Sequence, residues 1–247
     1  MKFQKLLQIM IKKIILIVLV FSCSLVQAQK GNMNFGLQYK PIISSSYFDA
    51  GTLNIQEDGF ALNLSPQYGS SLGMIVRYNL SNTFSFETGM NLVQRNYRLN
   101  ISNTENSLDD FSDFGLRAYE LPFQFLSYVK VSKNIYLNAS FGISYSIFSS
   151  DVYSVGEENQ YFEQITTIRK RAQPALIANL GGEYRTNLKG YYYLGFSFYR
   201  PFENIARIYA KYDDGDYIYN GSAPSSTSSY SELNGNYLTI DLRYFFM

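Results

Sequence analysis

The chain has 247 residues and a formal net charge of +1, from 21 basic and 20 acidic side chains. Because nucleic-acid-binding domains carry clustered basic residues, this balance gives no reason to expect a nucleic-acid partner. The chain also contains 23 Tyr and 19 Phe but no His and no Trp. Tyrosine combines an apolar ring with a polar tip, so its abundance suits a protein that lies between water and an apolar phase.

The first 28 residues have the pattern of a secretory signal peptide. A basic region ends at Lys12-Lys13, an apolar stretch covers residues 14–21, and Val26-Gln27-Ala28 offers a cleavage site. The apolar stretch is short for a bilayer span, which disfavours the alternative of a permanent anchor helix. We therefore expect a cleaved signal peptide over residues 1–28 and a single domain over residues 29–247.

Cys23 is the only cysteine of the chain, and it lies inside the predicted signal peptide. The segment 20–23 loosely resembles a lipoprotein signal, in which Cys23 would carry a lipid, but Phe21 is bulky for that motif. After removal of the signal peptide, the chain can form no disulfide and no thiolate metal site.

The remaining chain alternates apolar and polar residues with a period of two, which indicates strands with one apolar face. No stretch after residue 28 is apolar for 18 residues, so no transmembrane helix is predicted. The alternation is clearest over residues 83–93, 135–147 and 238–246. The eight predicted strands cover residues 34–41, 71–80, 83–93, 119–131, 135–147, 174–185, 191–200 and 238–246.

The connections between these strands fall into two kinds that alternate along the chain. Short turns are expected at residues 81–82, 132–134 and 186–190, and long polar connections at residues 44–70, 100–118, 149–172 and 202–236. Outer-membrane barrels have this asymmetry, with short periplasmic turns and long extracellular loops. The sequence therefore predicts an all-β fold: an eight-stranded antiparallel up-and-down transmembrane β-barrel with four long extracellular loops.

A soluble barrel of the lipocalin kind is the main alternative, because it shows the same alternation with its apolar side chains turned inward. The loop asymmetry favours the membrane barrel. So do the glycines on the polar face, where a narrow lumen would crowd larger side chains: Gly89, Gly142, Gly181 and Gly195. Aromatic residues gather at the short-turn end, where an interfacial girdle is expected: Tyr78, Tyr191, Tyr192, Tyr193, Tyr244 and Phe246.

The segment Tyr119-Glu120-Leu121-Pro122-Phe123 resembles the Glu-aliphatic-Pro signature of the PorT-like outer-membrane β-barrel family of Bacteroidota. Further similarity lies in Gly36-Leu37-Gln38-Tyr39, Glu87-Thr88-Gly89 and Gly181-Gly182-Glu183-Tyr184-Arg185, whereas Tyr119 stands where an aliphatic residue is commoner. The resemblance implies an integral outer-membrane barrel. One named family member takes part in a gliding and secretion apparatus.

Pro122 cannot donate a hydrogen bond to a neighbouring strand, so we expect it at a bulge or at a strand end near the long loops.

Charged residues on the polar face of the predicted strands are expected inside the barrel or near its rims. They are Arg77, Glu87, Arg95, Glu183, Arg185, Asp241 and Arg243. An ion pathway or a ligand site is one interpretation, and a set of paired charges that fills the lumen is the other. Eight strands leave room for side chains but not for an aqueous channel, and buried charges persist when they are paired. We favour pairing.

The sequence gives no catalytic constellation. The enzymes known among outer-membrane barrels rely on a histidine as general base, and this chain has none. Asp213-Asp214-Gly215-Asp216 lacks the spaced ligands and the distal Glu of a calcium loop. We therefore predict no enzymatic activity and no catalytic, cofactor-binding or metal-binding residues.

Two functions remain open after this reasoning. The first is a structural or surface-interaction barrel with a plugged lumen, whose long loops meet partners in or outside the envelope. The second is a component of a secretion or gliding complex of the PorT type, or a small pore. In either case the expected partners are outer-membrane lipid and, through the loops, envelope or secretion proteins. Tyrosines of the last loop are candidate contacts: Tyr209, Tyr212, Tyr217, Tyr219 and Tyr230.

Overall fold

The computed structural model describes residues 33–43, 53–57, 60–103, 108–158, 162–186, 190–212 and 231–246. The predicted signal peptide and the Asp213-Asp214-Gly215-Asp216 segment lie outside these residues. All the regular secondary structure assigned in the described residues is β-strand, which confirms the all-β class. Within the same residues, no helix is long and apolar enough to cross a bilayer.

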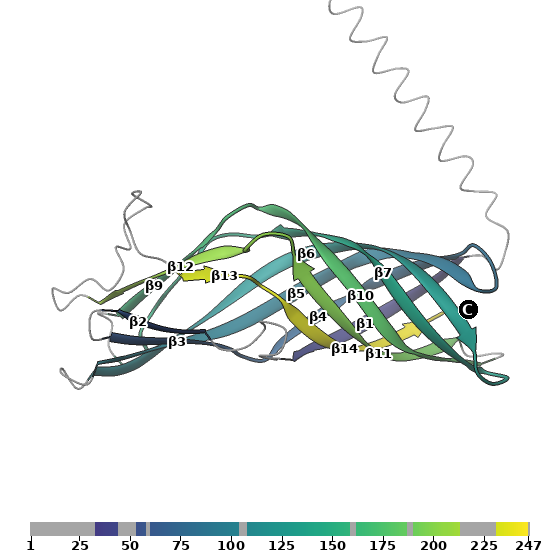
Figure 1. The fold of residues 1–247 in the computed structure, drawn as a ribbon, viewed down its shortest axis with the longest axis horizontal. Coiled ribbons are helices and arrows are strands. Elements are labelled where there is room, and N and C mark those ends of the chain that lie inside the picture. The colour runs from purple at the N-terminus through teal and green to yellow at the C-terminus, as the bar shows by residue number, and fades with distance from the viewer. Residues whose placement is uncertain are drawn as a thin grey trace, which may run out of the picture.

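Eight antiparallel strands form a closed ring in which neighbours in the sequence are neighbours in space (Figure 1). They are β1 (Met33–Ile43), β4 (Gly69–Asn79), β5 (Phe84–Asn103), β6 (Leu108–Lys130), β7 (Ile135–Phe148), β10 (Ala172–Arg185), β11 (Tyr191–Pro201) and β14 (Tyr237–Phe245). The ring closes where β14 pairs with β1. All eight predicted strands are present, and the predicted up-and-down barrel is confirmed.

The short connections lie together at the end of the ring where the chain finishes (Figure 1). Between β4 and β5, the hydroxyl of Ser81 accepts hydrogen bonds from the backbone N–H groups of Thr83 and Phe84, at 3.2 and 3.0 Å. Between β10 and β11, Gly190 has a φ of 87°, a left-handed conformation that glycine adopts without steric cost. Its carbonyl accepts from the backbone N–H and the hydroxyl of Thr186. These local contacts keep the turns short.

Apolar side chains cover the outside of the ring and polar ones point inward. Phe125, Phe141 and Leu180 are each more than 60% exposed, whereas Arg77 and Asp241 are completely buried. This arrangement is the reverse of a soluble barrel, so the lipocalin alternative is wrong. Gly181 and Gly195 face each other across β10 and β11, and the ring of Tyr193 lies over both, so the lumen is as crowded at these glycines as predicted.

The predicted long loops contain strands of their own, which the sequence reasoning missed. They are β2 (Leu53–Glu57), β3 (Phe60–Pro66), β8 (Val152–Val155), β9 (Phe162–Ile168), β12 (Ala206–Tyr212) and β13 (Ser231–Leu233). β2 and β3 extend the ring sheet beside β5, and the others form a second sheet in the order β13-β12-β9-β8. β5 and β6 are also longer than predicted, at 20 and 23 residues.

The inward and outward faces exchange polarity part-way along β5 and β6. On the short-turn side of Leu92 and Tyr119, which are register partners, most inward residues of these strands are polar and most outward residues are apolar. Beyond this pair, Leu99 and Phe114 point inward and are buried, while Arg98 points outward and is exposed. We infer that the apolar outer belt, and with it the bilayer, ends at the level of Leu92 and Tyr119.

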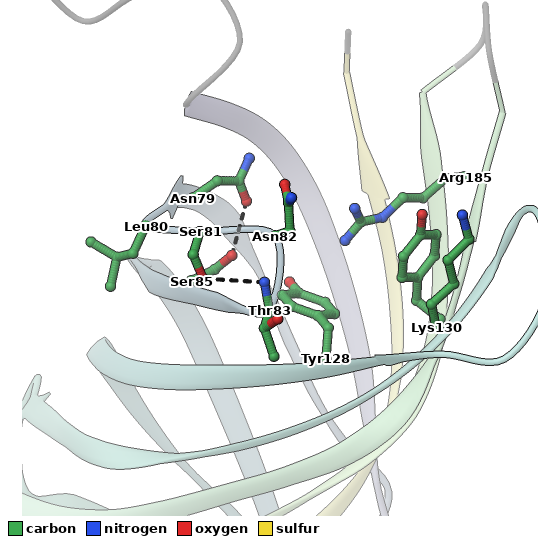
Figure 2. Close-up of a pocket in the computed structure, with 10 residues that line it drawn as sticks. Asn79, Leu80, Ser81, Asn82, Thr83, Ser85, Tyr128, Lys130 and Arg185 are labelled. Atoms are coloured by element: carbon green, nitrogen blue, oxygen red, sulfur yellow. Dashed lines mark hydrogen bonds between the residues drawn. The ribbon is translucent and has the colours of Figure 1, made fainter.

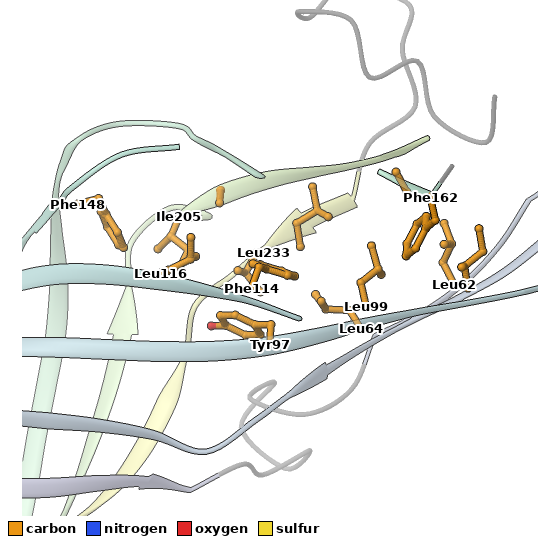
Figure 3. Close-up of a cluster of buried hydrophobic side chains, with 14 of the residues drawn as sticks. Leu62, Leu64, Tyr97, Leu99, Phe114, Leu116, Phe148, Phe162, Ile205 and Leu233 are labelled. Atoms are coloured by element: carbon orange, nitrogen blue, oxygen red, sulfur yellow. The ribbon is translucent and has the colours of Figure 1, made fainter. Parts of the chain in front are cut away.

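An apolar core fills the part of the protein beyond this boundary (Figure 3). The second sheet packs over the extended β5 and β6, and both sheets contribute side chains. The core residues are Leu62, Leu64, Tyr97, Leu99, Ile101, Phe114, Leu116, Ala118, Phe148, Phe162, Ile205, Ala206, Ile208, Ala210 and Leu233. The extracellular end is therefore a packed β-structure in its own right.

Candidate functional site

The interior of the eight-stranded ring holds a balanced set of buried charges. Four cations and four anions lie there, and each is at most 5% exposed: Lys40, Arg77, Arg95, Arg243, Glu87, Glu120, Glu183 and Asp241. Alternation places them inward, since Asp241 and Arg243 are two residues apart on one strand and Arg77 is the register partner of Glu87. Buried charges persist in proteins when they are paired and hydrogen-bonded, and the contacts inside the ring meet this condition.

Arg77 lies at the centre of the larger group. Its Nε donates to Glu87 at 2.6 Å and its Nη1 to Glu183 at 2.5 Å. The guanidinium lies over the ring of Phe245, 3.9 Å from the ring centroid, so its planar face is covered as well. Arg77 therefore joins carboxylates from two different walls of the barrel, β5 and β10.

The ion pairs continue from Arg77 in both directions as one chain of alternating charge. Glu87 also accepts from Arg243 at 2.9 Å, and Arg243 donates to Asp241 at 2.6 Å. Asp241 pairs in turn with Lys40 at 3.3 Å and accepts from the hydroxyl of Ser197 at 2.6 Å. The full order is Lys40, Asp241, Arg243, Glu87, Arg77, Glu183 and Arg185.

A second group, nearer the apolar core, is built around Arg95 and Glu120. Arg95 donates to one carboxylate oxygen of Glu120 at 2.9 Å, and the hydroxyl of Tyr237 donates to the other at 2.7 Å. The rings of Tyr199 and Tyr237 stack at 4.5 Å, and the Arg95 guanidinium faces both, 5.0 and 4.7 Å from their centroids. This group fills the lumen directly below the apolar core.

All seven charges predicted from the sequence lie in the lumen or at its rim, as expected. Six are buried, and Arg185 is partly exposed at the short-turn end. Sequence reasoning missed Lys40 and Glu120. Both could have been found from the pattern, because Lys40 follows Gln38 at a spacing of two on the first predicted strand, and Glu120 lies inside the Glu-aliphatic-Pro segment.

Pro122 does not lie at a strand end, so that prediction is wrong. It falls inside β6, and the register of β5 and β6 is the same on both sides of it, without a bulge. The pairing is interrupted only between the pairs Thr88–Phe123 and Asn91–Glu120. The proline has no N–H to donate, and the local interruption in the pairing of β5 and β6 accommodates this. The same interruption lies beside the inward carboxylate of Glu120.

A polar pocket of about 640 Å³ opens at the short-turn, periplasmic end of the lumen (Figure 2). The turn between β4 and β5 forms one side, and the ends of β6, β7 and β10 form the other. The described residues that line it include two cations, Lys130 and Arg185, and no carboxylate. They are Asn79, Leu80, Ser81, Asn82, Thr83, Ser85, Tyr128, Lys130, Tyr136 and Arg185. Across the described ranges, no group of three or more His, Cys, Asp or Glu side chains could hold a metal ion.

Outside the membrane region, Arg98 and Asp113 form an exposed pair across β5 and β6, with two hydrogen bonds of 2.7 Å. The hydrogen bonds from Arg98 hold the pKa of the Asp113 carboxyl below its ordinary value. Arg98→Gln is expected to return that pKa toward the ordinary value. The pair stabilises the fold above the unfolded-state pKa, and this contribution is lost as the pH falls through the depressed pKa. A carboxyl NMR titration of both proteins measures the shift.

Comparison with known proteins agrees with this architecture. Residues 27–207 match the family described as outer membrane protein beta-barrel domain. The chain belongs to this family. Outer membrane protein beta-barrel domain proteins lie in the outer membrane, so membrane lipid surrounds the apolar belt of the ring. No curated protein sequence is similar enough to the chain to be counted as a relative.

Solved structures of outer-membrane barrels resemble the fold at low sequence identity. The outer membrane protein OprG from Pseudomonas aeruginosa superimposes with a TM-score of 0.52 and 11% identity, over 87% of this chain and 96% of OprG. The outer membrane protease OmpT from Escherichia coli gives a TM-score of 0.43 and 9% identity, over 88% and 98%. The toluene transporter TbuX from Ralstonia pickettii gives 0.23 and 9%, over 87% and 89%. The likeness to OprG supports the fold alone.

Proposed function

We propose that this outer-membrane barrel is a non-enzymatic structural or surface-interaction protein whose lumen is closed to ions. One observation carries the proposal: paired charges fill the membrane-spanning interior, and an apolar core follows directly above them. An ion crossing the barrel would have to break the pairs around Arg77 and Arg95. It would then have to enter a packed apolar core, where few polar groups could replace its water.

The extracellular end supports an interaction role. Its second sheet packs on the extended β5 and β6 through a continuous apolar core, which gives the surface a rigid base. Function is often carried by loops that a rigid scaffold positions. Of the proposed contact residues, Tyr209 is buried within this end, so it acts as part of the scaffold and not as a contact. Tyr217, Tyr219 and Tyr230 lie outside the described residues.

A conductance measurement tests the closed lumen. The purified protein, inserted in a planar bilayer, is expected to give no steady unitary current at moderate voltage, because paired charges and an apolar core occupy the inside of the barrel. Insertion is checked on the same preparation in liposomes, by protease protection of the membrane-spanning strands. Stable single-channel currents from inserted protein would show that it is a small pore instead.

We further propose that the chain is a PorT-like protein of Bacteroidota, exported by a signal peptide that is cleaved after Ala28. The support is the segment Tyr119-Glu120-Leu121-Pro122-Phe123 and the N-terminal charge and apolar pattern. Glu120 binds Arg95 and Tyr237 inside the lumen, which gives the Glu of the signature a structural role. N-terminal sequencing of the mature protein is expected to begin at Gln29.

The same resemblance favours a second candidate function, membership of a secretion or gliding complex. Affinity purification from native envelopes separates the two. Recovery of subunits of a secretion apparatus in stoichiometric amounts would favour the complex. Recovery of the barrel alone, or with surface partners, would favour the structural or surface role.

A further inference from the structure

The periplasmic pocket is a site built from hydrogen-bond donors. The pocket opens away from the apolar core, and both charge groups lie between the pocket and the core. Binding in the pocket therefore does not depend on whether the lumen conducts ions. Arg185 and Lys130 enter it from the ends of β10 and β6, and Figure 2 shows Asn79 and Asn82 on the opposite side. Because no carboxylate is among its described lining residues, an anion that enters meets two cations and lines up against no carboxylate in the pocket wall.

Arg185 is held in position, and most of its donors remain available. Its Nε donates to Glu183 at 2.5 Å, and its guanidinium lies among the rings of Tyr128, Tyr136 and Tyr191, at 5.0, 4.1 and 5.2 Å from their centroids. Among the described residues, its two terminal nitrogens donate to no protein atom. An arginine that is fixed by its Nε and presents its outer N–H groups has the geometry that binds oxyanions.

Tyr128 gives an independent indication that this pocket holds a ligand. Tyr128 lines the pocket and is 95% buried, and its hydroxyl has no hydrogen-bond partner among the described residues. Buried hydroxyl groups nearly always find a partner in proteins. Asn79 is oriented as well, because its side-chain oxygen accepts from Ser85 at 2.9 Å, which leaves its NH₂ group as a donor.

Around the pocket, the described cations outnumber the carboxylates that they contact. Glu183 is the nearest carboxylate in the network, and it already accepts from both Arg77 and Arg185. Lys130 contacts the ring of Tyr136 and forms no ion pair with a described residue. The mouth of the barrel is therefore net positive.

We propose that this pocket binds a phosphate group from the periplasmic side. The terminal nitrogens of Arg185 and the ammonium of Lys130 bind its oxygens, and the Tyr128 hydroxyl donates to one of them. A free phosphate and the phosphate of a lipid headgroup in the inner leaflet share this chemistry.

Titration calorimetry on the full chain in dodecyl maltoside micelles, which carry no phosphate, tests the proposal. Saturable heat is expected with inorganic phosphate if the source is soluble. If the source is lipid, it is expected only with phosphatidic acid added to the micelles. Arg185→Gln is expected to weaken binding at least about tenfold, and Lys130→Gln and Tyr128→Phe by smaller factors. Lys133→Gln, which removes an exposed cation from the adjacent turn outside the pocket, is the matched control and is expected to leave binding unchanged.

Folding is checked for each variant by the different gel mobility of heated and unheated protein. Lys130 is exposed, so its variant tests the site even if the Arg185 variant fails to fold. The proposal is overturned if neither phosphate source binds. It is also overturned if both Arg185→Gln and Lys130→Gln bind as tightly as the unchanged protein, or if Lys133→Gln weakens binding as much as they do.

Discussion

Arg77→Gln is expected to lower the free energy of unfolding by about 3–5 kcal/mol, the usual cost of removing one partner from a buried ion pair. Arg77 is completely buried and donates to both Glu87 and Glu183. Glutamine keeps one polar donor but removes the charge, so three buried cations would face four buried anions. Equilibrium unfolding in guanidinium chloride, with the barrel in detergent or lipid, measures the change.

Arg98→Gln is the matched control, because Arg98 also binds a carboxylate through two hydrogen bonds but is solvent-exposed. Exposed pairs contribute little because water and salt screen them, so its effect is expected to be much smaller. Equal effects of the two substitutions would mean that the lumen around Arg77 is hydrated and behaves as a surface.

A double-mutant cycle then separates the pair from its surroundings. Arg77→Met together with Glu183→Met removes one charge of each sign, so the buried set stays balanced. The double variant is expected to cost less than the sum of the single variants, by about 0.5–3 kcal/mol. Additive costs would contradict the direct coupling that the 2.5 Å contact indicates.

The sequence predicts a strand of this protein as far as the apolar residues of that strand stay on its outward face. All eight ring strands were predicted, because each keeps one apolar face over the width of the bilayer. The predicted end of β5 at Val93 is too early and the predicted start of β6 at Tyr119 is too late, because the pattern changes there. Inward residues change from Glu87 and Asn91 to Val93 and Leu99, although the strand continues without interruption. A prediction that follows one continuous apolar face therefore ends the strand where the inward residues change from polar to apolar.

The short strands of the loops were missed for a related reason. Two of them, β8 and β13, have only four and three residues, and the longer ones lie in connections whose composition is mostly polar. Their stability comes from side chains distant in sequence, as when Leu62, Phe162 and Leu233 meet in one core. The pairing of the lumen charges was predictable in kind but not in detail. Which carboxylate binds Arg77 depends on the register and curvature of the closed ring.

Phe141→Arg is expected to lower the free energy of unfolding by about 2–4 kcal/mol when the barrel is in a lipid bilayer, the cost of an arginine on a lipid-facing strand near the membrane centre. Phe141 lies in the middle of β7, points outward, and is 62% exposed in the absence of lipid. By exposure alone, the substitution would be harmless in a water-soluble protein.

Tyr153→Arg is the control that separates exposure to lipid from exposure to water. Tyr153 is another exposed aromatic residue, at 58%, but it lies on β8 in the second sheet, beyond the boundary marked by Leu92 and Tyr119. Its replacement is expected to cost little, because an arginine there stays in water. If both substitutions cost the same, the outer face of β7 does not contact lipid, and the inward orientation of the charges would need a cause other than a membrane. A large cost at Phe141 alone means that the bilayer selects which face of the alternating strands turns outward.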